Sequence, residues 1–374
     1  MLGLYVHIPF CAAICNYCNF NRGLFDADLK RRYVDALVAE IARERESVPA
    51  AADTIYFGGG TPSLLSADDV TRIVDACRRS FTITPDAEIT LEANPETVSV
   101  PLLAAFRAAG VNRLSLGVQS LRDDELVQLS RLHGAARARD AVGEARAAGF
   151  DNLSLDLMMW LPEQRTEVWL ESVDGAIALQ PDHLSLYLLE VYPNAPLRDE
   201  MARARWSQAP DEDAEAMYLA AMERLEAAGL GQYEISNVAK SGRESRHNVK
   251  YWSDGEWLGF GCGAHSTRAG VRWKNVSSTE DYVSRVKAGE SVRIDARTLS
   301  SEERLGDALF TGLRLTEGLD LGAVDERYGT DVWARYGAEL EPFVLEGLLV
   351  HDTGRLRLTR RGMLLAHEVM TVFV

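Results

Sequence analysis

The sequence predicts an α/β protein, with a partial parallel barrel followed by a smaller α+β domain. Short apolar runs alternate with helical patterns six times in the first half of the chain. This alternation is typical of parallel strands joined by right-handed helical crossovers. The last part of the chain instead shows helices and then a hairpin, which predicts a winged-helix-like domain. We expect the barrel over 1–195, a flanking segment over 196–299 and the C-terminal domain over 300–374.

Six segments of the first half have the length and composition of buried strands. In chain order they are "LGLYVHI", "DTIYFGGG", "AEITLEANP", "NRLSLGVQS", "NLSLDLMMWLP" and "DHLSLYLLE". A helix is predicted after each of the first five. Ser66 is the expected N-cap of the second helix, and Gly110 and Gly149 are expected to end the third and the fourth.

The second half has a different pattern. A long helix is predicted from Asp211 to Gly229, and the segment after it reads as short strands and loops packed beside the barrel. Near the end, two short strands flank the turn Asp352-Thr353-Gly354 and precede a last helix. A winged-helix shape serves either DNA binding or protein interaction, so it does not indicate a function by itself.

Unusual residues follow five of the predicted strands, which favours a partial barrel over an open doubly wound sheet. They are a cysteine run, a "GGGTP" turn, Glu92, Gln119 and Asp156. In a barrel the carboxyl ends of the strands converge on one mouth, where barrel enzymes hold their chemistry. In an open sheet the same residues would be spread along an edge.

Composition narrows the class of protein. The 374 residues are 47% hydrophobic, enough for a sizeable core, and no stretch approaches 18 uncharged apolar residues. The beginning of the sequence lacks the pattern of a secretory signal, and clustered cysteines favour a reducing compartment, so we expect a cytoplasmic protein. A net charge of −16 disfavours nucleic acid as a partner.

Cys11, Cys15 and Cys18 form a C-x3-C-x2-C run. Three thiolates on one tight loop can bind three irons of a cubane iron–sulfur cluster and leave the fourth iron open to a small molecule. The alternatives are a zinc site completed by a distant His or Cys, and cysteines buried in a core. Cys77 and Cys262 are expected to be core residues. Tyr17, next to Cys18, could lie against an adenine.

Other polar features support a ligand at the same mouth. The glycines of "FGGGTP" allow a backbone to approach a ligand, although a plain turn is the alternative. Glu92, Gln119, Arg131 and Asp156 together could bind an amino group, ribose hydroxyls and a carboxylate, whereas singly each could be a cap or a solvated residue.

The segment "RHNVKYW" places a histidine, a tyrosine and a tryptophan together in a predicted loop. Imidazole is a common ligand of haem iron, and aromatic rings can stack on a porphyrin. The alternative is a solvent-facing histidine beside core aromatics.

These motifs, taken in order, resemble the radical S-adenosylmethionine superfamily. The similarity is greatest to the branch that contains oxygen-independent coproporphyrinogen III oxidases and the haem chaperones called HemW. It rests on "YVHIPFC", "YFGGGTPS", "SLGVQS", "YEISN", "RHNVKYW", "GFGCGAHS" and "GLRLTEGL". The resemblance implies a partial TIM-like barrel of six strand–helix units with a cluster at the top and a C-terminal accessory domain.

The resemblance also implies site residues. Cys11, Cys15 and Cys18 match the ligands of a [4Fe-4S] cluster. The positions that match S-adenosylmethionine-binding residues are Tyr5, Tyr17, Gly59, Gly60, Thr61, Glu92, Gln119, Arg131 and Asp156, with a weaker match near Glu190. No residue is assigned a catalytic role.

Three features favour the chaperone branch. Phe20 stands where the oxidases carry a further cysteine, and the oxidases have a longer segment before the cluster. The H-N-x-x-Y-W motif, here His247, Asn248, Tyr251 and Trp252, is associated with haem binding in the chaperones, so His247 is the predicted haem ligand.

One segment departs from the family pattern. After the fifth strand the family usually reads "DLIYGLPGQ", and here the chain reads "DLMMWLPEQ", with Trp160 and Glu163 in place of glycines. One interpretation is that Trp160 narrows the S-adenosylmethionine site and reduces its radical chemistry. The alternative is a lineage variant without effect there.

The leading hypothesis is a haem chaperone with a [4Fe-4S] cluster, S-adenosylmethionine and haem as cofactors. Its expected partners are haem-acceptor proteins and a reductant protein, and the sequence leaves room for transient membrane association and for a homodimer. The alternative is a coproporphyrinogen III oxidase, which converts propionates by radical oxidative decarboxylation to give protoporphyrinogen IX.

Overall fold

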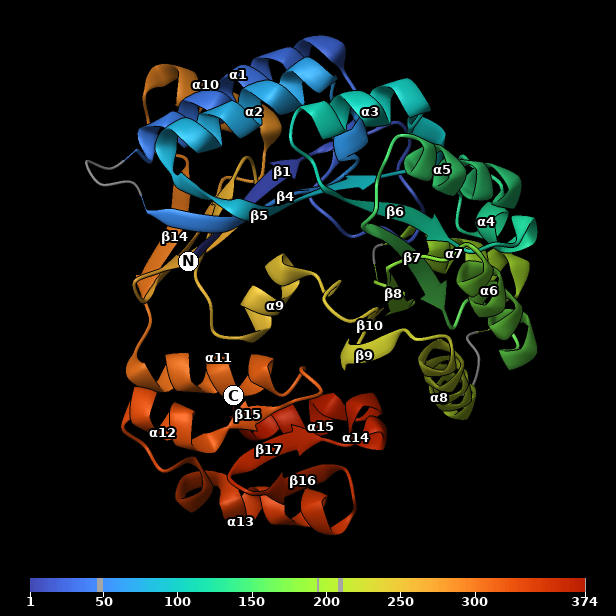
Figure 1. The fold of residues 1–374 in the computed structure, drawn as a ribbon, viewed down its shortest axis with the longest axis vertical. Coiled ribbons are helices and arrows are strands. Elements are labelled where there is room, and N and C mark those ends of the chain that lie inside the picture. Colours follow the sequence, from blue (N-terminus) through green and yellow to red (C-terminus); the bar gives the residue numbers. More distant parts are fainter. Residues whose placement is uncertain (46–49, 194, 208–210, 374) are drawn as a thin grey trace.

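A computed structural model describes residues 1–45, 50–193, 195–207 and 211–373. Its main feature is a twelve-stranded sheet in the order β14-β13-β12-β11-β1-β4-β5-β6-β7-β8-β10-β9. The six central strands run parallel and curve into a partial barrel (Figure 1). They are β1 (Leu2–Ile8), β4 (Ala51–Gly59), β5 (Thr82–Ala93), β6 (Arg113–Gln119), β7 (Leu153–Met159) and β8 (His183–Leu188).

Helices connect these strands and cover the outside of the barrel (Figure 1). They are α1 (Ala27–Arg43), α2 (Ala67–Ser80), α3 (Val100–Ala108), α4 (Asp123–Gln128), α5 (Ala135–Ala147) and α6 (Thr166–Ala178). Ser66 caps α2 through a capping box with Asp69, as the sequence predicts. Gly110 and Gly149 follow α3 and α5 with positive φ, which suits glycine after a helix.

Side-chain alternation along the strands separates an apolar outer face from a polar interior. On β1, Leu4, Val6 and Ile8 are buried in the main hydrophobic core. Between them, the Tyr5 hydroxyl and the His7 ring contact each other at 3.1 Å on the inner face. The barrel therefore has an apolar outer face under its helices and polar groups inside.

The segment expected to pack beside the barrel instead extends its sheet at both edges. After α7 (Pro196–Ala204) and α8 (Asp211–Ala227), β9 (Gly231–Glu234) and β10 (Asn237–Ala239) continue the sheet from β8. On the other side the sheet continues from β1 through β11 (Trp257–Phe260), β12 (His265–Arg268), β13 (Val271–Asn275) and β14 (Arg293–Thr298), and α10 (Thr279–Ala288) packs on α1.

Helix α9 (Arg246–Trp252) lies between the barrel and the C-terminal domain (Figure 1). It contains the "RHNVKYW" segment, for which the sequence predicted a loop. Ser245 caps the helix, and Glu88 accepts hydrogen bonds from the backbone N–H groups of Arg246 and His247. These caps, one of them contributed by a distant strand, explain why the segment folds as a short helix.

The C-terminal domain has its own hydrophobic core. It consists of α11 (Ser301–Gly312), β15 (Leu319–Asp320), α12 (Leu321–Tyr328), α13 (Val332–Leu345), β16 (Leu349–Asp352), β17 (Arg355–Leu358), α14 (Arg360–Leu364) and α15 (Ala366–Met370). The hairpin around Asp352-Thr353-Gly354 forms as predicted, although the last predicted helix is divided into two. Within the described residues, no helix is long and apolar enough to cross a membrane.

Candidate functional site

The three clustered cysteines lie at the carboxyl end of the barrel. Cys11 belongs to β2 (Phe10–Cys11), a short strand that pairs with β3 (Gly23–Leu24), and Cys15 and Cys18 follow in the connecting loop. All three are free thiols and line one cavity of about 400 Å³. Burial raises the pKa of the Cys11 thiol. The protein thus brings three thiols to the mouth that the sequence predicted.

The glycines after β4 are required by the way this loop meets the cysteine loop. Gly59 has a φ of 116°, and a Cβ there would lie 2.5 Å from the His7 ring. A Cβ on Gly60 would lie 3.0 Å from the Cys11 sulfur and 2.8 Å from the Phe10 carbonyl oxygen. Larger residues would therefore push the two loops apart.

Two carboxyl groups face the same cavity from neighbouring parts of the barrel. Glu92 accepts hydrogen bonds from the Tyr56 hydroxyl at 2.8 Å and from the Gly59 N–H at 3.2 Å. Burial raises its pKa to about 7, and burial also raises the pKa of Asp156. Asp156 accepts a hydrogen bond from the Ser115 hydroxyl at 3.1 Å. The site thus has acidic groups that can bind a cation or hydroxyl groups.

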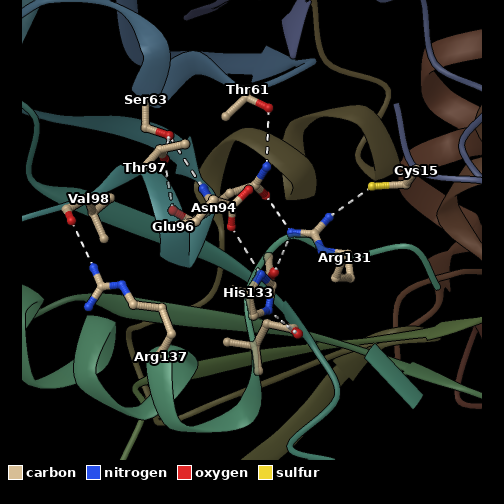
Figure 2. Close-up of polar contacts among 12 residues, drawn as sticks. Cys15, Thr61, Ser63, Asn94, Glu96, Thr97, Val98, Arg131, His133 and Arg137 are labelled. Carbon is tan, nitrogen blue, oxygen red and sulfur yellow. Dashed lines mark hydrogen bonds and ion pairs between the residues drawn. The ribbon is translucent and has the colours of Figure 1, made fainter. Parts of the chain in front are cut away.

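Arg131 connects the cysteine loop to the ends of two strands (Figure 2). One terminal nitrogen of its guanidinium lies 3.4 Å from the Cys15 sulfur, and the other donates to Asn94 Oδ1 at 2.7 Å and to the Gly117 carbonyl at 2.9 Å. Arg131 thus holds the cysteine loop against the ends of β5 and β6.

Of the other predicted positions, Tyr17, Thr61 and Gln119 also line the cavity, as does Glu190. Gln119 has a φ of 66°, unusual for a residue with a side chain, at the point where β6 ends. Phe20 lies at the cavity as well, with 68% of its surface exposed.

Two family models match separate regions of the chain, and known proteins match it over its full length. The Radical SAM superfamily model matches residues 5–174, and the HemN C-terminal domain model matches residues 299–365. The heme chaperone HemW of Bacillus subtilis is 35% identical over 100% of this chain and 99% of its own. The HemW of Mycobacterium tuberculosis strain H37Rv is 38% identical over 98% of this chain and 93% of its own.

The chain belongs to the HemW family of radical SAM proteins. Among solved structures, that of coproporphyrinogen III oxidase (HemN) from Escherichia coli is similar, with a TM-score of 0.87. The alignment covers 100% of this chain and 89% of that chain, and the sequence identity is 24%, so this likeness concerns the fold alone. The partial barrel with a HemN-like C-terminal domain is confirmed.

The radical SAM superfamily implies a [4Fe-4S] cluster and S-adenosylmethionine, and the residues at the mouth fit both. A cubane cluster binds each thiolate through a different iron. The three cysteines line one cavity. Among the described residues, however, no three His, Cys, Asp or Glu side chains lie close enough together to hold a single metal ion. This spacing agrees with a cluster, in which each thiolate binds its own iron. The glycine edge and the carboxyl groups provide space and acceptors for an amino acid and a ribose.

Two predicted positions lie elsewhere in this radical SAM barrel. Tyr5 does not line the described cavity but lies on the inner face of β1, where its ring stacks on that of Tyr56 with centroids 6.3 Å apart. In this position Tyr5 lies in the barrel interior below the site, and its contact with S-adenosylmethionine stays a prediction.

His247 lies at the opposite, amino-terminal end of the barrel. It is 1% exposed, its Nδ1 is 2.8 Å from the Thr54 hydroxyl, and its Nε2 is 2.7 Å from the Tyr251 hydroxyl. Thr54 precedes Gly59 by five residues on β4, a separation of about 16 Å at 3.3 Å per residue. The histidine of the H-N-x-x-Y-W motif is therefore buried and hydrogen-bonded at both ring nitrogens. Its ligation of haem iron stays a prediction.

Trp160 does not narrow the cluster cavity, contrary to the effect considered from the sequence. Both Trp160 and Glu163 have positive φ, 62° and 61°, which explains the family's usual glycines at these positions. Trp160 is not among the described residues that line the cluster cavity. It lines a different cavity, beside the C-terminal domain.

Sequence reasoning missed Asn94. This residue donates to the Thr61 hydroxyl at 3.2 Å and accepts from Arg131, so it connects three loops of the mouth (Figure 2). Its place two residues after Glu92, at the end of β5, was the available signal. Its partners lie far away in the chain, which is why the pattern did not reveal its role.

Proposed function

We propose that this protein binds haem and delivers it to acceptor proteins. The observation that supports this most directly is its similarity over the full length to proteins named heme chaperone HemW. Phe20 adds support, because a phenylalanine stands at the cluster cavity where the oxidases are expected to carry a cysteine.

In this proposal the cluster mouth is a site for S-adenosylmethionine. Cys11, Cys15 and Cys18 would hold the cluster, which would supply an electron for cleavage of the sulfonium. Glu92 in its ionised form accepts hydrogen bonds from the ligand's ammonium, and Asp156 accepts from ribose hydroxyls. Arg131 keeps the cysteine loop against the strand ends. A reductant protein would provide the electron.

Partners and location belong to the same proposal. The net charge of −16 favours protein partners over nucleic acid, and clustered reduced thiols favour the cytoplasm. Homodimer formation and transient membrane contact during haem delivery are compatible with it.

Haem titration of the cluster-reconstituted full-length protein tests the proposal. We expect saturation at one haem per chain with a Soret band distinct from that of free haem. The His247→Ala variant tests the motif-based ligand in the same experiment, with Soret position as the readout. Absence of saturable haem binding by the wild-type protein would contradict the proposed function.

The alternative, a coproporphyrinogen III oxidase, is favoured by one observation, the HemN-like fold. Fold similarity at this level of identity does not carry the activity. Turnover of coproporphyrinogen III is therefore the measurement that separates the two functions.

A further inference from the structure

A second cavity, separate from the cluster site, lies between the barrel and the C-terminal domain. Its volume is about 580 Å³, within the range of small-molecule sites. The ends of β7 and β8 and one face of α8 form its barrel side, and α14 with the residues around it forms the other. Such clefts between domains are frequent places for ligands.

The walls of this cavity are largely apolar and include an indole and two thioethers. Met159, Trp160 and Leu186 line it from the barrel, and Met363 and Leu365 line it from the C-terminal domain. Aromatic and thioether groups suit the flat face of a conjugated ring. Trp160 takes part from a left-handed backbone position, with a φ of 62°.

The C-terminal side also provides a cation and an imidazole. Arg361 lines the cavity, and within the described part of the chain its guanidinium has no ion-pair or hydrogen-bond partner, whereas its neighbour Arg360 pairs with Glu226. The His367 side chain is 73% exposed, and its Nε2 is 3.3 Å from Glu368. The opposite side, on α8, carries Glu212 and Glu215.

We propose that this interdomain cavity is the haem site, with His367 as the iron ligand and Arg361 as the partner of a propionate. The proposal rests on the proposed function and names the place where the haem is held. To bind iron, His367 would leave its contact with Glu368 at the exposed surface. The buried His247 would instead have to leave Thr54 or Tyr251. An Arg without a partner suits a carboxylate.

The interdomain cavity lies next to the cluster cavity, so the proposed haem site adjoins the proposed S-adenosylmethionine site. Leu188 lines both this cavity and the cluster cavity, so haem and S-adenosylmethionine would occupy adjacent but separate spaces. Haem binding is therefore expected to leave S-adenosylmethionine affinity unchanged, and saturating S-adenosylmethionine should leave haem affinity unchanged.

The test is a haem titration of cluster-reconstituted full-length variants, followed by Soret absorbance, with S-adenosylmethionine affinity measured in parallel. Trp160→Gly removes the indole at a φ that glycine favours, and His367→Gly and Arg361→Gln change exposed side chains. His351→Ala and Arg357→Gln, in the same domain but outside the cavity lining, are the matched controls.

We expect His367→Gly to weaken haem binding at least tenfold and to shift the Soret band, with added imidazole restoring the band. Trp160→Gly and Arg361→Gln should weaken binding several-fold, and neither control should change it. Wild-type haem affinity and spectrum in His367→Gly and Trp160→Gly would overturn this site while leaving the proposed function intact. Failure of the wild-type protein to bind haem would instead overturn the proposed function.

Discussion

At the scale of single residues, the cluster site depends on charged side chains that are both buried and hydrogen-bonded. Glu92 illustrates this, because burial raises its pKa to about 7 while the Tyr56 hydroxyl and the Gly59 N–H stabilise its ionised form. A carboxyl group with this pKa changes its charge near neutral pH. Its ability to bind the ammonium of an amino-acid ligand should change with it.

We therefore predict that S-adenosylmethionine affinity rises by up to about tenfold from pH 6 to pH 8, because only the ionised Glu92 accepts from an ammonium. Glu92→Gln should lose this pH dependence and bind at least about tenfold more weakly. Calorimetric titrations at pH 6, 7 and 8 measure both. Glu171→Gln, on the exposed face of α6, is the control. A pH-independent affinity in the wild-type protein would contradict this role.

The positions of side chains could be predicted where the residues follow the end of a strand. Cys11, Glu92 and Asp156 could be placed at one mouth because parallel strands deliver their carboxyl ends to one side. The contact of Tyr5 with S-adenosylmethionine stays a prediction, because Tyr5 lies on the inner face of β1 and does not line the cavity. Sequence alone does not say how deep in the barrel an inward side chain lies.

At the scale of elements, the added strands are attached to the barrel through a buried carboxylate. Glu40 on α1 accepts hydrogen bonds from the Gly261 N–H at 2.8 Å, the Asn275 amide at 2.6 Å and the Tyr282 hydroxyl at 2.6 Å. These donors follow β11, end β13 and lie on α10. One side chain thus connects four elements.

Glu40→Gln should lower the free energy of unfolding by about 2–3 kcal/mol. Both oxygens of Glu40 accept hydrogen bonds, so the NH2 group of glutamine would face a donor at either position. The shift in denaturant midpoint of the purified protein measures this. Glu280→Gln, which removes an exposed ion pair with Arg32, should cost less than about 1 kcal/mol. Equal effects of the two substitutions would be inconsistent with the network described.

The six strand–helix units were predictable from the spacing of apolar residues. Each strand is a continuous apolar run, and in each helix the apolar residues repeat with the helical period. Short strands were also predicted after the long helix, but their pairing at the two edges of the barrel sheet was not, because it depends on residues far away in the chain. Helix α9 was missed since part of its N-terminal capping comes from Glu88 on β5.

At the scale of the whole molecule, the H-N-x-x-Y-W motif connects the barrel to the C-terminal domain. The Arg314 guanidinium lies 4.3 Å from the ring centre of Trp252 and pairs at 3.0 Å with Glu234, which is fully buried. Backbone hydrogen bonds from Ile235 to Arg314 and from Thr316 to Tyr233 join the same surfaces. These contacts set the position of the two halves of the interdomain cavity.

Arg314→Met should destabilise the protein by about 3 kcal/mol, because it leaves the buried Glu234 carboxylate without its cation. Calorimetry should show earlier unfolding and a separated transition for the C-terminal domain. Arg335→Met, which removes an exposed pair with Glu302, should leave the thermogram close to that of the wild type. Unchanged unfolding of Arg314→Met would show that this ion pair does not join the domains.

We propose that this radical SAM protein handles haem and does not make its precursor. Anaerobic incubation of the cluster-reconstituted protein with coproporphyrinogen III, S-adenosylmethionine and a reductant tests it most directly, with porphyrins separated by chromatography after oxidation. A parallel sample receives haem in place of coproporphyrinogen. We predict stoichiometric haem binding and no protoporphyrin above the protein-free control. Catalytic formation of protoporphyrinogen IX would contradict the account.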